Sequence, residues 1–238
     1  MSLWLLDADA AHWPPVSAAL KEPNGLLAVG GDLSPHRLRQ SYQRGVFPWY
    51  SPGEPLLWWS PDPRGVFMLD GHRPSPSLRR QLRRDQLRLS CDRDFSAVIH
   101  ACAEPRPQSP GCWITHEMIS SYQQLHALGD AHSLEVWDAQ GQLVGGLYGV
   151  AVGLMFCAES MFSRINNGSK LALALLRQLL WQQGAKLFDC QLLNPHLQSL
   201  GAQHYPRGLY LQQLAAHSQQ ASPWPLWRGQ DLTAVIGG

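Results

Sequence analysis

The stretch from Lys186 to Ala202, KLFDCQLLNPHLQSLGA, constrains the fold more than any other part of the chain. An apolar run carries one acid and one amide on alternate residues and stops at Asn194-Pro195, which is typical of a strand that ends at a cleft. Successive strand side chains take opposite faces, so Asp189 and Gln191 are predicted to share one face. Their Cα atoms would lie roughly 6 to 7 Å apart, so the carboxylate could orient the amide.

The same alternation is also typical of an ordinary half-exposed strand. Two interpretations are therefore open for this segment. Either the acid and the amide are two solvated polar groups, or they form a pair that works in a cleft.

Composition limits the class of protein. The chain has 238 residues and is 45% hydrophobic, enough to form a core for one large domain or two modest ones. The uncharged run Leu143 to Ala158 is shorter than the ~20 residues of a bilayer span and contains four glycines, so we expect strands there and no membrane contact. The five cysteines form no CxxC pair, which predicts reduced thiols in the cytoplasm rather than disulfides or a zinc site.

Charge is distributed unevenly along the chain. The formal net charge is +1, yet seven arginines stand against two aspartates between Gly71 and Arg93. A helix over residues 78–87, capped by Ser77, would place its leucines on one side and four arginines opposite. A solvated helix face is one interpretation, but charges of one sign repel one another and favour phosphate binding. The arginines are Arg79, Arg80, Arg83 and Arg84.

The N-terminal quarter is predicted to form a small unit. We expect a strand over residues 26–31 and a helix that starts with Ser34-Pro35 and stops at Gly45. The next segment, Phe47 to Arg64, has five prolines and five aromatic residues, which excludes a regular helix or a central strand. It is either a rigid connector or a stacking platform. The predicted domain boundary lies near residue 62, giving domains 1–62 and 63–238.

The second part is predicted to be a mixed sheet with helices. A helix should run from Thr115 to Gly129, followed by three antiparallel strands over residues 133–137, 143–151 and 154–159. A buried helix that starts at Asn167 or Ser169 and runs through Trp181, and the strand after Lys186, complete an α+β or mixed α/β fold. The tail from Ala221 is predicted to be irregular.

Several long motifs resemble the leucyl/phenylalanyl-tRNA protein transferase family from about Pro15 to Arg207. They are EPNGLLAVGGDLSPHRLRQSYQRGVFPWYSPGEPLLWWSPDPR, HSLEVWD, GGLYGV, FCAESMFSRINNGSK and DCQLLNPHLQSLGA. The resemblance implies a small N-terminal α+β domain and a larger domain with the acyl-CoA N-acetyltransferase fold. It also implies transfer of Leu or Phe from charged tRNA to proteins beginning with Arg or Lys, which marks them for degradation. Met-tRNA is a third candidate donor, no cofactor is needed, and we expect a monomer.

The resemblance also assigns residues. The family's DxQxLN motif makes Asp189 and Gln191 the catalytic pair, and we expect their alanine variants to fold normally yet lose transfer. Glu159 and Asn194 would contact the acceptor, although on sequence alone Glu159 is equally a surface acid. Adenosine would stack on aromatic residues that are otherwise plain core. These are Trp49, Trp113 and, more weakly, Tyr42.

The aminoacyl side chain needs an apolar pocket, and the family's positions are predicted to supply it. Core packing is the alternative for any of them, above all for the helix leucines. Leu147 stands where methionine is commoner in the family, which bears on the Leu to Phe preference. The pocket residues are Leu147, Phe156, Met161, Leu173, Leu176, Leu180 and Phe188.

Two other functions are open. A CoA-dependent N-acetyltransferase would cradle pyrophosphate on a glycine-rich loop, but Met161 to Lys170 holds only Gly168. A non-catalytic RNA-binding module would use the arginine helix and the aromatic segment. The histidines are scattered without ligand spacing, so no metal site is predicted.

Overall fold

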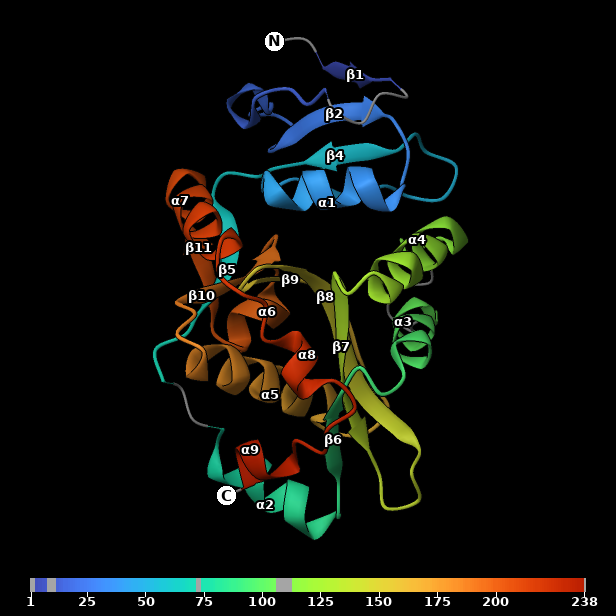
Figure 1. Cartoon of the computed structure of the whole chain (residues 1–238), viewed down its shortest axis with the longest axis vertical. Helices are drawn as coiled ribbons and strands as arrows, with labels where there is room; N and C mark the ends of the chain where they lie inside the picture. The colour runs from blue at the N-terminus through green and yellow to red at the C-terminus, as the bar shows by residue number, and fades with distance from the viewer. Residues whose placement is uncertain (1–2, 8–11, 72–73, 106–112, 238) are drawn as a thin grey trace.

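The computed structural model describes residues 3–7, 12–71, 74–105 and 113–237, and these form two sheets with helices around them (Figure 1). The small sheet has the order β1-β2-β4-β3. Its strands are β1 (Trp4–Leu6), β2 (Leu26–Gly30), β3 (Phe47–Pro48) and β4 (Leu57–Trp59). The mixed α/β class predicted from the sequence is confirmed.

The large sheet has seven strands in the order β11-β5-β10-β9-β8-β7-β6. Strands β9 and β10 are parallel, whereas the other neighbouring strands are antiparallel. The strands are β5 (Arg64–Met68), β6 (Arg88–Cys91), β7 (Ala131–Trp137), β8 (Leu143–Val152), β9 (Met155–Ser163), β10 (Leu187–Gln191) and β11 (Ala202–Tyr205). The predicted meander corresponds to β7, β8 and β9.

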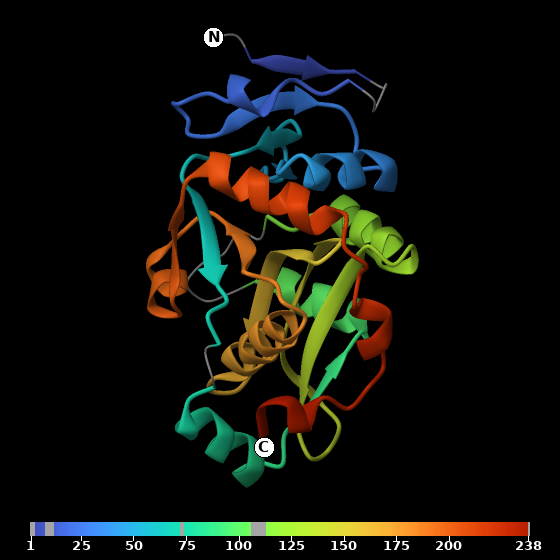
Figure 2. The same cartoon turned by 60° about the vertical axis from the view of Figure 1, so that its left-hand side comes forward.

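The helices of the described residues lie on both faces of the large sheet and between the two sheets (Figures 1 and 2). The helix α7 crosses between the small sheet and the large sheet and contacts α1, β8 and β9. The helices are η1 (Val16–Ala18), α1 (Pro35–Gln43), α2 (Pro76–Arg84), α3 (Phe95–Ala103), α4 (His116–Ala127), α5 (Gly168–Gln182), α6 (Pro195–Ser199), α7 (Arg207–Ser218), α8 (Trp224–Trp227) and α9 (Thr233–Gly237). No described helix is both long enough and apolar enough to span a bilayer.

Local sequence signals set the ends of α1 as predicted. The Ser34 hydroxyl accepts a hydrogen bond from the backbone N–H of Arg37, and Pro35 occupies the first turn. Gly45 follows with a φ of +72°, a conformation that suits glycine. Helix ends marked by a capping serine, a first-turn proline and a following glycine can therefore be predicted without tertiary information.

Three local predictions are wrong. Strand β4 lies between β2 and β3, although the segment from Phe47 to Arg64 was predicted to contain no central strand. A central strand is possible here because Leu57–Trp59 contains no proline. Helix α2 is capped by Ser75 rather than Ser77 and ends at Arg84, after which β6 begins.

The tail after Ala221 is also more regular than predicted. It forms α8 and α9, and Trp224 is fully buried. The backbone N–H groups of Gly229 and Leu232 donate to the carbonyls of Cys91 and Leu89 on β6. The tail therefore covers the edge strand of the large sheet, which would otherwise leave hydrogen-bonding groups unpaired.

The large sheet separates two hydrophobic clusters. One joins the small sheet and α1 to the sheet face that carries Val66 and Tyr148. The other lies on the opposite face, under α5, and includes Phe67, Leu147 and Phe188. The small sheet and the near face of the large sheet thus share one core, and the predicted boundary at residue 62 falls between β4 and β5.

Close approach of α5 to the sheet depends on glycine. A Cβ on Gly145 of β8 would come within 2.7 Å of the backbone of Gly168 at the start of α5. Neither residue has a side chain, so helix and strand backbones can pack directly against each other. This packing fixes the start of α5 beside the end of β9.

Candidate active site

Strands β9 and β10 both change register beside the point where they pair. They pair at Asp189 and Cys157, and each then has an extra residue relative to its other neighbour. In β9 the extra residue is Glu159, and in β10 it is Cys190, just before Gln191. A bulge bends its strand and redirects a side chain, so the two strands can present polar groups toward each other here.

Gln191 does not share a face with Asp189 as predicted. Its φ is +62°, in the left-handed region, which breaks the alternation of the strand. The side chain therefore joins Phe188 and Cys190 in lining a cavity on the α5 side of the sheet. Its Nε2 donates a hydrogen bond to Glu159 Oε1 at 2.5 Å, so Glu159, and not Asp189, orients the amide.

Asp189 does not reach a cleft, contrary to the prediction. It is fully buried, and its two oxygens accept four hydrogen bonds. The Arg64 Nε and the Gln191 backbone N–H donate to Oδ1 at 2.8 Å each, while Arg64 Nη2 and the Tyr210 hydroxyl donate to Oδ2 at 2.6 and 3.0 Å. A carboxylate offers about four lone-pair sites, so none is left for a substrate.

Arg64 is a site residue that the sequence prediction missed. Its guanidinium lies between the rings of Phe47 and Tyr210, 4.8 and 4.7 Å from their centroids, and donates to the Gly45 carbonyl. Burial by itself lowers the pKa of this group, but the charge of Asp189 outweighs burial and leaves the pKa raised. The available signal was an arginine placed directly after a proline-rich turn, at the start of a strand.

Glu159 is half-buried and lies within β9, which continues to Ser163 instead of ending at Glu159 as predicted. The Tyr122 hydroxyl donates to its Oε2 at 3.1 Å, and Tyr42 and Tyr122 share a hydrogen bond of 2.5 Å. Burial raises the pKa of Glu159 to about 7, although hydrogen bonds from Tyr42, Tyr122 and Gln191 act in the opposite direction.

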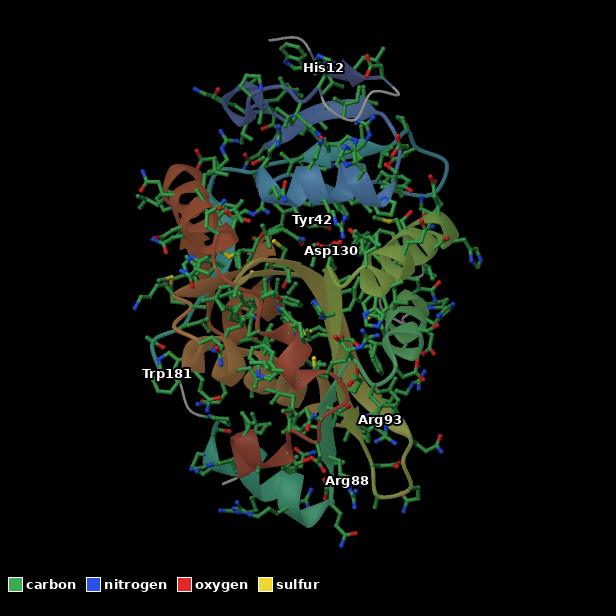
Figure 3. The ribbon with its side chains drawn as sticks, in the orientation of Figure 1. His12, Tyr42, Arg88, Arg93, Asp130 and Trp181 are labelled. Atoms are coloured by element: carbon green, nitrogen blue, oxygen red, sulfur yellow. The ribbon has the colours of Figure 1, made fainter. Side chains whose placement is uncertain are left out.

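Tyr42 is buried rather than exposed on a stacking surface. Figure 3 shows it on the side of α1 that faces the large sheet, consistent with its hydrogen bond to Tyr122. In this position Tyr42 supports the Glu159 network. Its predicted contact with adenosine stays a prediction.

The predicted aminoacyl pocket corresponds in part to a cavity of about 80 Å³, several times the ~10–15 Å³ that one water needs. Four predicted residues line it: Leu147, Met161, Leu173 and Phe188. Phe67, Ala158, Ser160, Cys190 and Leu197 complete the wall with Glu159 and Gln191. The cavity is thus mostly apolar, with Ser160 in its wall and a polar end where the acid and the amide meet.

Three predicted pocket residues do not line this cavity: Phe156, Leu176 and Leu180. All three are fully buried in the cluster under α5, and Phe156 packs against Trp224 with ring centroids 4.8 Å apart. Helical spacing alone could not separate the α5 positions that face the cavity from those that face the core.

The predicted adenosine-stacking tryptophans lie on neighbouring segments. Trp49 is 42% exposed and forms an edge contact with Trp59, with ring centroids 5.7 Å apart. Trp113 is half-buried at the start of the α4 segment. A hydrogen bond of 3.2 Å between Tyr50 and Thr115 joins the two segments.

Asn194 caps helix α6. Its Oδ1 accepts a hydrogen bond from the backbone N–H of Leu197 at 2.8 Å, and Leu197 lines the cavity. The exposed asparagine thus holds α6 beside the cavity. Its predicted contact with the acceptor stays a prediction.

The arginine helix α2 lies at the opposite end of the molecule from the small sheet (Figure 1). Arg80, Arg83 and Arg84 are exposed, and Arg79 is half-buried. Arg84 pairs with Asp85, and Arg83 donates to the carbonyl of Gly237. Figure 3 shows the same separation between Tyr42 and Arg88.

The prediction that histidines are scattered is wrong for one group. Potential ligand atoms of Asp92, His126 and His132 lie within 4.8 Å of one another. They are already hydrogen-bonded: His132 Nδ1 lies 2.6 Å from Asp92 and Nε2 3.1 Å from the Gly129 carbonyl, while His126 Nδ1 lies 2.8 Å from the Ala131 carbonyl. These bonds join α4, β7 and the residue that follows β6, and a metal would have to displace them.

The four cysteines of the described residues, Cys91, Cys102, Cys157 and Cys190, are free and buried, as predicted for reduced thiols. Cys112 lies outside the described residues. Burial raises the pKa of the Cys190 thiol beside the cavity, so it stays protonated at neutral pH.

Comparison with known proteins shows which protein family the chain matches. Residues 66–215 match the family leucyl/phenylalanyl-tRNA protein transferase, and residues 31–62 match its N-terminal domain. A leucyl/phenylalanyl-tRNA protein transferase of Tolumonas auensis is 49% identical over 98% of this chain and 100% of its own length. That of Edwardsiella ictaluri is 51% identical over 99% of this chain and 96% of its own length.

Two solved structures match part of the chain weakly. One is that of L-PGS from Bacillus licheniformis, with a TM-score of 0.38 and 15% identity over 57% of this chain and 49% of the other. The second is a GCN5-related N-acetyltransferase from Sphaerobacter thermophilus, with a TM-score of 0.36 and 15% identity over 77% of this chain and 58% of the other. The sequence matches are far stronger than these, and by them the chain belongs to the leucyl/phenylalanyl-tRNA protein transferase family.

Proposed function

We propose that the chain transfers a leucyl or phenylalanyl group from charged tRNA to the N-terminal α-amine of a protein that begins with Arg or Lys. The supporting observation is the cavity beside β9 and β10, whose walls are mostly apolar and whose polar end holds Glu159 and Gln191. Leu and Phe side chains offer nothing to hydrogen-bond, so an apolar wall suits them. Met-tRNA is a further proposed donor.

The donor enters with its aminoacyl side chain in the cavity and its ester at the polar end. The ester is already activated, so the protein has to position two substrates and assist proton transfer. Because Gln191 Nε2 donates to Glu159, its Oε1 remains available to accept a hydrogen bond from the incoming amine. This contact aims the nitrogen lone pair at the ester carbonyl.

The tRNA is held by two further regions. The terminal adenosine stacks on Trp49 and Trp113, and such stacking is worth about 1–3 kcal/mol per base and is independent of tRNA identity. The arginines of α2 contact backbone phosphates away from the reacting ester. Acceptor contacts at Glu159 and Asn194, a monomeric state and a cytoplasmic location complete the proposal.

A transfer assay tests the proposal directly. Radiolabelled Leu-tRNA and an Arg-initiated peptide should yield labelled peptide, whereas labelled acetyl-CoA should not. Gln191→Ala should fold, because the amide is half-exposed and Glu159 keeps its hydrogen bond from Tyr122. It should lose transfer, because the incoming amine loses the group that aims it. Acetylation of the peptide in place of leucylation would contradict the proposal.

A further inference from the structure

The proposed transfer needs a group that accepts a proton from the attacking amine. Among the described residues that line the cavity, the ionisable ones are Glu159 and Cys190. The Cys190 thiol is a poor base because its pKa is raised by burial. Asp189 does not line the cavity, and its oxygens already accept hydrogen bonds from Arg64, Tyr210 and the Gln191 backbone.

We propose, on the basis of the transferase function above, that the Glu159 carboxylate takes the proton from the amine and returns it to the ribose oxygen. Glu159 is the extra residue of the β9 bulge, and its carboxylate lies at the polar end of the cavity beside Gln191. The amine that Gln191 holds is therefore placed next to the carboxylate.

The step balances without a cofactor. The amine nitrogen forms a bond to the ester carbon, and the carbonyl π electrons move to the oxygen. Glu159 accepts one proton from the nitrogen. When the carbonyl re-forms, the bond to the ribose oxygen breaks and that oxygen takes the proton from Glu159, which yields a peptide bond, a free ribose hydroxyl and an ionised Glu159.

The surroundings of Glu159 suit both halves of this cycle. Its pKa of about 7 lies near the working pH, where a group can both accept and release a proton. The titratable groups that face it are Tyr42 from α1, Tyr122 from α4 and Asp189 from β10, with Cys157 on its own strand. Burial and Asp189 raise the pKa of Glu159, whereas the two tyrosines lower it.

The pH dependence of single-turnover transfer distinguishes this role from simple acceptor binding. The free α-amine has a pKa of about 7.7–8.0, so wild-type log rate should fall with a slope of about one below pH 7.5 and about two below pH 6.5. In Glu159→Gln the rate at pH 8 should fall by roughly 10²–10⁴-fold and the acid slope should stay near one. The loss should be similar for Arg-initiated and Ala-initiated peptides.

Two more variants complete the test. Glu135→Gln is the matched control, because burial also raises the pKa of Glu135 to about 7, but Glu135 bonds Ser90 and Ser133 away from the cavity. It should keep the wild-type profile. Tyr122→Phe removes a hydrogen bond that lowers the pKa of Glu159, so its steeper slope should begin at a higher pH.

The possible outcomes separate the two proposals. A wild-type rate and a slope of two in Glu159→Gln would overturn the proton-transfer role, as would a loss confined to discrimination between Arg-initiated and Ala-initiated peptides. An unmoved profile in folded Tyr122→Phe would also contradict it. Absence of leucyl transfer by the wild type at every pH would instead refute the proposed function itself.

Discussion

At the scale of single residues, Asp189 holds the backbone of Gln191, and its oxygens already accept four hydrogen bonds within the protein. Its ion pair with Arg64 is buried, and its Oδ1 holds the N–H of Gln191 at 2.8 Å. A left-handed conformation costs a non-glycine residue about 1–3 kcal/mol and persists only where the surroundings enforce it. Asp189 is therefore a positioning residue that keeps Gln191 aimed at the cavity.

This position changes what we expect of Asp189→Ala. The sequence suggested a normally folded, inactive variant, but removing the carboxylate leaves the Arg64 charge buried without its partner. Loss of one member of a buried ion pair costs about 3–5 kcal/mol, which urea denaturation should detect as a lower midpoint.

A half-exposed pair provides the control for this measurement. Arg39 and Asp130 also form an ion pair, with side chains 42% and 23% exposed, so Asp130→Ala should cost only about 0–1 kcal/mol. Equal urea midpoints for Asp189→Ala and Asp130→Ala would show that the buried pair is not the support described here.

At the scale of elements, we propose that the donor preference is set where β8, β9 and α5 meet. Leu147 lines the cavity from β8 and is fully buried. A methionine at this position has one more rotatable bond and a polarisable sulfur, and so adapts to a planar ring better than leucine does.

Leu147→Met should therefore raise kcat/KM for Phe-tRNA relative to Leu-tRNA several-fold. Leu180→Met is the matched control, because Leu180 is as fully buried but packs in the core away from the cavity. The two ratios should be compared at one salt concentration. An unchanged ratio in Leu147→Met, or the same change in both variants, would exclude Leu147 as a determinant of preference.

The same elements show what the sequence can predict. Helix caps at Ser34 and Thr115, glycine stops and the β7-β8-β9 meander follow from local chemistry, and they are confirmed. The bulges at Glu159 and Cys190 do not follow from local chemistry, because a residue in an irregular strand looks in sequence like one in a regular strand. Period-two reasoning therefore placed Asp189 and Gln191 on one face, and the actual partners Arg64 and Glu159 became visible only in three dimensions.

Contacts between distant segments limited the prediction in the same way. Tyr42 and Tyr122 are 80 residues apart in the chain, and Trp224 of the tail packs on His132 with ring centroids 4.4 Å apart. Neither contact has a local signal. Three of the seven positions that the family resemblance assigned to the pocket do not line the cavity, because a family motif does not show which way Phe156 points from β9 or how each α5 leucine is rotated.

At the scale of the whole molecule, the separation between α2 and the small sheet predicts a divided tRNA interface (Figure 1). Arg80→Ala should weaken transfer from full-length Leu-tRNA and reduce the magnitude of the salt dependence of log Kd by about 0.7–0.9, the contribution of one phosphate contact. It should leave transfer from a short leucyl-adenosine donor unchanged, because that donor does not extend to α2. Lys21→Ala, an exposed cation beside the small sheet, is the control.

A different pattern would contradict the divided interface. Equal loss with the full-length and the short donor would mean that Arg80 acts at the reacting end or on the fold. An unchanged salt dependence in Arg80→Ala would mean that α2 makes no phosphate contact through this residue.

The position of a bound donor tests the central claim most directly. The measurement is a crystal structure of the protein with a hydrolysis-resistant amide analogue of leucyl-adenosine. We predict density for the leucyl side chain between Leu147, Met161 and Leu173, and for the carbonyl beside Glu159 and Gln191. Density for the leucyl group elsewhere, with this cavity unchanged, would contradict the account.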